Sequence, residues 1–124
     1  MKALSKTAAP AAIGPYSQAI MAGDTVYVSG QLPINPSTGE FAEGGIKEQA
    51  RQSLNNIKNI LAEAGMTMQQ VVKVTVLMTD MSDFAAVNEV YAEFFSAPYP
   101  ARSAFAVAAL PKGGAIEIEA VAVK

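Results

Sequence analysis

The last stretch of the chain constrains the fold most, because it is extended and apolar on both faces. Side chains of a strand point alternately to opposite faces. From residue 116 onward one face carries only apolar side chains, and on the other face two glutamates give way to two valines. The first face is formed by Ile116, Ile118, Ala120 and Ala122, and the second by Glu117, Glu119, Val121 and Val123. Apolar side chains on both faces of this predicted strand therefore have to be buried against other parts of the protein, although on the second face this applies only to the two valines.

Two helices are predicted from apolar side chains that recur at spacings of three and four. The first begins at Ile46, continues to Ala64 and ends at Gly65, a typical C-terminal stop. The second has its apolar stripe between Phe84 and Phe94 and ends before Pro98. Ser82 is expected to be its N-cap residue.

The remaining segments predict strands and one long loop. A hairpin is indicated by two short extended runs that flank Gly23-Asp24. Turn dipeptides mark residues 33–45 as a loop, and alternation predicts a strand over residues 72–79. Two last strands, 103–108 and 115–123, are joined through residues 110–114. The whole chain, residues 1–124, is predicted to form one domain.

This order predicts an α+β fold with two helices packed on a mainly antiparallel sheet. Five or six strands make a sheet roughly 25 to 30 Å wide, of which two helices about 10 Å across can cover only one face. Charged residues make up only 16% of the chain, against a typical share of about 25%. The uncovered face, which includes Val121 and Val123, is therefore expected to meet another subunit in a dimer or trimer.

Composition excludes several classes of function. The net charge is −2 and the nine Lys and Arg residues are scattered, so nucleic acid is not an expected partner. The chain has neither Cys nor His, so no metal site is predicted, and a general base has to be Asp, Glu, Lys, Tyr or a bound water. The absence of a leader-like or membrane-spanning apolar run predicts a cytoplasmic location with no membrane partner.

Only two arginines occur, and they differ in their surroundings. Arg51 lies off the apolar stripe of the first helix and is expected at the solvated surface. Arg102 follows Pro100-Ala101 where a predicted strand begins, and its planar fork of donors could grip a carboxylate. From position alone, a structural ion pair with a glutamate at a strand end is the favoured explanation of Arg102.

Other polar candidates remain open when they are judged from the residues alone. Glu117 and Glu119 share one strand face and could serve one site or be solvated separately. Asn88 lies near the apolar stripe of the second helix and could be a structural amide. Tyr16, in a turn, and Ser29-Gly30, at a strand end, could line a site or only satisfy turn geometry.

These segments together resemble the reactive intermediate deaminase (RidA/YjgF) family of 2-iminobutanoate/2-iminopropanoate deaminases. The resemblance covers essentially the whole chain and rests on five ordered motifs. They are Ala12–Gln18, Val28–Gln31, Asp83–Asn88, Pro100–Ser103 and Ile116–Ala120.

The resemblance implies a chorismate-mutase-like fold, a homotrimer with sites in clefts between subunits, and no cofactor. The substrates would be small 2-imino acids, hydrolysed to 2-oxo acids and ammonia. The implied roles are carboxylate binding for Arg102, positioning of the attacking water for Glu119, and the pocket wall for Tyr16, Ser29, Gly30 and Asn88. Arg51 and Glu117 keep their surface interpretation.

One position departs from the family pattern, because many members have a cysteine where this chain has Ala104. The expectation is that this position contributes its backbone to the pocket. The alternative function is non-enzymatic, as a small-metabolite-binding regulator or a holdase chaperone on the same trimer. A ribonuclease, an activity attached to some relatives, is disfavoured by the pI of about 5.0 and the absence of histidine.

Overall fold

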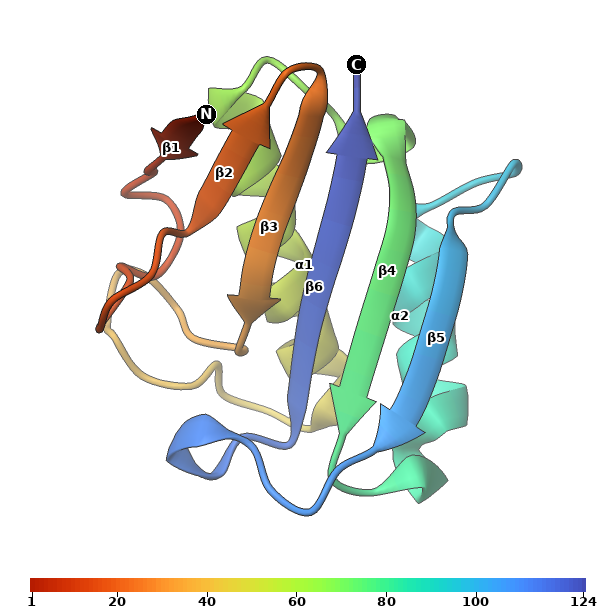
Figure 1. Cartoon of the computed structure of the whole chain (residues 1–124). Coiled ribbons are helices and arrows are strands. Elements are labelled where there is room, and N and C mark those ends of the chain that lie inside the picture. The colour runs from red at the N-terminus through yellow and green to blue at the C-terminus, as the bar shows by residue number, and fades with distance from the viewer.

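The computed structural model describes residues 1–124 as one sheet backed by two helices (Figure 1). The helices are α1 (Ile46–Glu63) and α2 (Phe84–Phe94). The strands are β1 (Lys2–Leu4), β2 (Ala19–Ala22), β3 (Thr25–Gln31), β4 (Val71–Met78), β5 (Ala101–Ala106) and β6 (Ile116–Val123). Three short 3-10 turns, η1 (Met68–Gln70), η2 (Met81–Asp83) and η3 (Pro111–Gly113), join them.

The six strands form a single sheet in the order β1-β2-β3-β6-β4-β5. All neighbours are antiparallel except β4 and β5, which run parallel. The last strand of the chain therefore lies in the middle of the sheet, between β3 and β4. This central place explains why β6 is apolar over most of its length.

Both helices lie on the same side of the sheet (Figure 1). Side chains of β6 that point to this side, Ile116, Ile118 and Ala122, are fully buried against the helices. From α1 the core receives Leu54, Ile57 and others of the predicted stripe. The opposite side, called here the open face, carries no helix. The α+β class, the mainly antiparallel sheet and the placement of both helices on one face are thus confirmed.

Three details differ from the sequence predictions. β1 was not predicted, because three residues are too few for a periodicity to be visible. Residues 101–106 and 116–123 follow each other in the chain but are not neighbours, because β5 pairs with β4 and β6 is inserted between β3 and β4. A parallel pair of this kind is formed through the α2 crossover.

The prediction that Ser82 caps the second helix is wrong. The helix begins one residue later than such a cap requires, with Asp83 at the N-cap position. Ser82 lies inside the turn η2, where its backbone N–H and its hydroxyl both donate to Asp80 Oδ1. The Asp80 carboxylate thus accepts both hydrogen bonds of Ser82, and the Ser82 hydroxyl does not cap the helix.

The central position of β6 yields a stability prediction. Replacing the fully buried Ile118 with alanine should lower the free energy of unfolding by about 2 to 5 kcal/mol, since it removes buried methyl groups and leaves a cavity. Met81→Ala, at an exposed position in η2, is the control and should cost much less. Chemical denaturation of both variants measures the difference, and equal losses would contradict the assigned core.

Candidate active site

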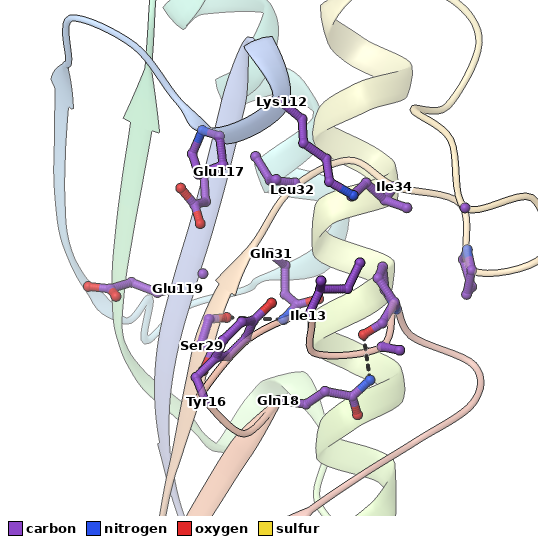
Figure 2. Close-up of a pocket in the computed structure, with 16 residues that line it drawn as sticks. Ile13, Tyr16, Gln18, Ser29, Gln31, Leu32, Ile34, Lys112, Glu117 and Glu119 are labelled. Atoms are coloured by element: carbon purple, nitrogen blue, oxygen red, sulfur yellow. Dashed lines mark hydrogen bonds between the residues drawn. The ribbon is translucent and has the colours of Figure 1, made fainter.

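A cavity of about 740 Å³ lies where the open face meets the N-terminal segment and the loop that follows β3. β3 contributes Ser29 and Gly30, and β6 contributes Glu117 and Glu119. In Figure 2 Tyr16 crosses in front of Ser29, and both glutamates project from the β6 ribbon. The remaining walls include Ile13, Leu32, Ile34 and Lys112.

The N-terminal wall of the cavity is held in place by a buried amide. Gln18 is only 5% exposed. Its Oε1 accepts from the Lys6 backbone N–H at 2.7 Å, and its Nε2 donates to the carbonyls of Lys6, Ala9 and Pro10. Ser29 Oγ adds a bond of 2.6 Å to the Ser17 carbonyl. Tyr16, between these anchors, is consequently held beside β3.

Gly30 allows a carboxylate to approach the backbone closely. It lies at an irregularity of the β3–β6 pairing between Val28 and Gln31. A Cβ at this position would collide with Glu117 Oε1. A side chain at position 30 would displace the Glu117 carboxylate, which lies close to the β3 backbone.

The two glutamates differ in their environment. Glu117 is half-buried and Glu119 is exposed. Burial raises the pKa of Glu117 above its ordinary value, and the negative charge of Glu119 raises the pKa further. A carboxyl group in a cavity whose pKa is shifted in this direction is a candidate for proton transfer. The prediction that Glu117 is a surface residue is thus wrong, because Glu117 is half-buried and lines the cavity beside Gly30.

Arg102 lies outside this cavity, on the edge strand β5. Its Nη1 donates to Asn88 Oδ1 at 2.9 Å. The guanidinium lies over the rings of Tyr91 and Phe84, at 4.6 and 5.1 Å from the ring centroids. Neither a glutamate nor an aspartate pairs with it, so the structural ion pair that position alone allowed is not formed.

The sheet register separates Arg102 from the glutamates. Arg102 is paired with Val74, which is buried on the helix side, whereas Glu119 is paired with Thr75 on the open face. β4 also stands between β5 and β6, a lateral separation of about 10 Å. In one chain, the arginine and the carboxylates therefore face opposite sides of the sheet.

The predicted site residues thus form two groups. Tyr16, Ser29, Gly30 and Glu119 line the cavity. Arg102 and Asn88 lie together between β5 and α2, and Ala104 packs partly buried on the same side of β5. Sequence reasoning missed Glu117 and Lys112 as lining residues. The glycine at position 30 was visible in the sequence, but its contact with Glu117 depends on strand register.

The other arginine is a structural residue. Arg51 Nε and Nη2 donate to the two carboxylate oxygens of Glu93, at 3.2 and 2.8 Å, and so link α1 to α2. Its surface interpretation is confirmed. No group of three or more Asp and Glu side chains is close enough to hold a metal ion, and no helix is long and apolar enough to span a membrane.

Fold, motifs and cavity together define a small α+β protein with a carboxylate-lined cleft. The chain matches the family described as Endoribonuclease L-PSP over residues 6–124. It is 54% identical over 121 residues to a 2-iminobutanoate/2-iminopropanoate deaminase from Capra hircus. The aligned region covers 98% of this chain and 88% of the relative.

Solved structures of similar sequence have the same fold. RidA from the Antarctic bacterium Psychrobacter sp. PAMC 21119 has a TM-score of 0.96 and 51% identity, over 100% of both chains. E. coli TdcF with bound serine has a TM-score of 0.96 and 46% identity, over 100% of this chain and 99% of the other. The chain belongs to the Endoribonuclease L-PSP family, and its resemblance to reactive intermediate deaminases is confirmed.

The burial of Glu117 yields a prediction about stability and pH. A carboxyl whose pKa is raised by folding destabilises the native state once it ionises, so this cost is absent below the ordinary glutamate pKa of about 4.3 and grows as pH rises. Glu117→Gln should therefore raise the melting temperature more at about pH 8 than at about pH 4. Thermal unfolding at both pH values measures this. The control Glu43→Gln, in an exposed loop, should change little, and an equal effect of the two substitutions would refute the assignment.

Proposed function

We propose that the protein is a homotrimeric 2-iminobutanoate/2-iminopropanoate deaminase, which hydrolyses 2-imino acids to 2-oxo acids and ammonia. The observation that carries this proposal is the identity of 54% over 98% of the chain with a relative of that name. The cavity agrees with it, because carboxylates, a tyrosine and backbone groups converge there.

The chemistry needs few groups. Water adds to the electrophilic C2 of the imine, the resulting tetrahedral adduct transfers a proton to its nitrogen, and ammonia leaves as the C=O bond forms. The protein has to hold the substrate carboxylate, direct the water and move protons. Orientation alone supplies a large part of such a rate enhancement.

Arg102 is the proposed carboxylate-binding residue. Its guanidinium is planar and can bind a carboxylate through two charge-assisted hydrogen bonds. Asn88 holds one edge of the guanidinium, and the rings of Tyr91 and Phe84 support its plane. These contacts fix the orientation of the fork and leave its other nitrogens for a ligand. Tyr16, Ser29 and Gly30 are proposed to form the wall that orients the imine, and Ala104 contributes backbone.

Two carboxylates are candidates for handling the water. The family resemblance assigned this role to Glu119, and we keep Glu119 as a residue of the cavity. The environment of Glu117 supports giving it the proton-transfer step, because burial and the neighbouring charge raise its pKa above the ordinary glutamate value. Glu119 then acts on the pKa of Glu117 as well as on the water.

A trimer is the proposed assembly because one chain does not complete this site. The open face carries exposed Tyr27, Phe105 and Val123, and exposed apolar side chains on a sheet face without helical cover are available for an interface. A neighbouring copy packed there can bring the Arg102 edge of its β5 to the cavity of the first. The site would then lie between subunits, with a carboxylate-binding side from one and the glutamates from the other.

The remaining sequence predictions stay predictions. These are the cytoplasmic location and the absence of a cofactor, a metal and a nucleic-acid partner. A metabolite-binding regulator or holdase is not favoured by the names of the relatives. The ribonuclease named in the family description would have to work without histidine in this chain.

Arg102 provides the most direct mutational test of the proposed reaction. Arg102→Ala should remove two charge-assisted hydrogen bonds and lower transition-state binding by roughly 2 to 5 kcal/mol. The expected loss in kcat/KM is roughly 30-fold to several thousand-fold. Arg102→Lys keeps the charge without the fork and should also be poor.

The assay generates 2-iminopropanoate from alanine with an amino acid oxidase and traps residual imine with semicarbazide. Arg51→Ala is the control, since Arg51 pairs with Glu93 on the helices. Near-wild-type hydrolysis by folded Arg102→Ala would remove this residue from the mechanism. An inactive wild type would favour the regulator or holdase.

The roles of the two glutamates can be separated by pH profiles. Glu117→Gln should abolish most of the activity at all pH values. Glu119→Gln removes a charge that raises the pKa of Glu117, so the acid limb of kcat/KM should move to lower pH. The opposite pattern, with Glu117→Gln active and Glu119→Gln inactive, would assign the proton transfer to Glu119.

A further inference from the structure

The apolar wall of the cavity is held from behind by a buried amide on α1. Leu32 and Ile34 line the cavity, and their backbone carbonyls accept hydrogen bonds from Asn56 Nδ2 at 3.3 and 3.0 Å. Asn56 itself is fully buried and does not line the cavity. This amide therefore connects the loop wall, defined as residues 32–34, to the helix beneath it.

The orientation of the Asn56 amide is also determined. Gln52, one helical turn earlier, donates from its Nε2 to Asn56 Oδ1 at 2.9 Å. The amide oxygen is thereby occupied, and the amide nitrogen is directed at the two loop carbonyls. A buried amide with both ends satisfied is rigid, whereas a buried carbonyl that loses its donor is costly.

The helix does not need Asn56 for its own place in the fold. α1 is anchored to the sheet by Leu54, Ile57 and Leu61, none of which is more than 1% exposed. The loop, in contrast, bonds largely to itself, as in Ala42 N–H to the Pro33 carbonyl at 2.8 Å. Loss of the Asn56 bonds should thus act on the loop wall more than on the helix.

We infer that Asn56 is a positioning residue that fixes the loop wall and so determines how the alkyl side chain of the substrate fits. Leu32 and Ile34 can offer only van der Waals contact, so the alkyl group is the part of a 2-imino acid that suits them. The carboxylate and the imine are left to Arg102 and the glutamates. This inference rests on the proposed function.

The test compares Asn56→Leu, which keeps the branched shape of the side chain but loses the bonds, with the milder Gln52→Ala, which only frees the amide to rotate. Asn55→Leu, at a half-exposed neighbouring position, is the matched control. Steady-state kinetics are measured with 2-iminopropanoate and with 2-iminobutanoate, which is longer by one methylene. Hydrogen exchange of the Ala42 amide reports on the loop directly.

We expect KM to rise by roughly two- to tenfold, the range that one net hydrogen bond spans, with a smaller change in kcat. The rise in KM should be larger for 2-iminobutanoate. In Asn56→Leu the Ala42 amide should exchange faster than in the wild type, whereas the amides of β6 should keep their rates. A folded Asn56→Leu protein with unchanged KM, or with equal losses for both substrates, would overturn the inference. If Asn56→Leu does not fold, Gln52→Ala decides between the same outcomes.

A wild-type protein that hydrolyses neither substrate would refute the proposed function rather than the role of Asn56 in fixing the loop wall. In that case the exchange rate of Ala42 alone decides. Faster exchange in Asn56→Leu supports this role of Asn56, and unchanged exchange refutes it.

Discussion

The rest of the structure depends on the fact that two helices cover only one face of a six-stranded sheet. On the helix side, strands and helices bury one continuous core, with β6 at its centre. On the open face the same strands present Glu117, Glu119 and exposed aromatic side chains. A single sheet thus separates a buried stabilising side from an exposed side that carries both glutamates.

Polar groups in the interior hold the loops that the sheet cannot order. Gln18 secures the N-terminal segment, and Asn56 secures the loop wall after β3. Both amides are at most 5% exposed and are bonded to backbone carbonyls. The cavity is in this way built from loops, yet each loop is tied to a rigid element, which is the usual basis of a preorganised site.

The sequence allowed the main elements and much of the site to be predicted, because α1 and β6 carry strong periodicities and because the motifs identify the family. Three features were beyond it. β1 is too short to show a pattern, the Asp80 side chain competes for Ser82, and the parallel β4–β5 pair depends on long-range packing. The burial of Glu117 was missed for a similar reason, since it arises from strand register next to Gly30. Local sequence does not encode such contacts between distant segments.

The proposal to test most directly is that each site takes its arginine and its glutamates from different subunits. Subunits carrying Arg102→Ala can be mixed with subunits carrying Glu117→Gln, each inactive alone, under conditions that allow exchange. Random mixed trimers then contain interfaces with both native residues, and about a quarter of wild-type activity should return, as a cyclic arrangement of equal interfaces requires. Mixed trimers verified by mass that stay inactive would contradict a site shared between subunits.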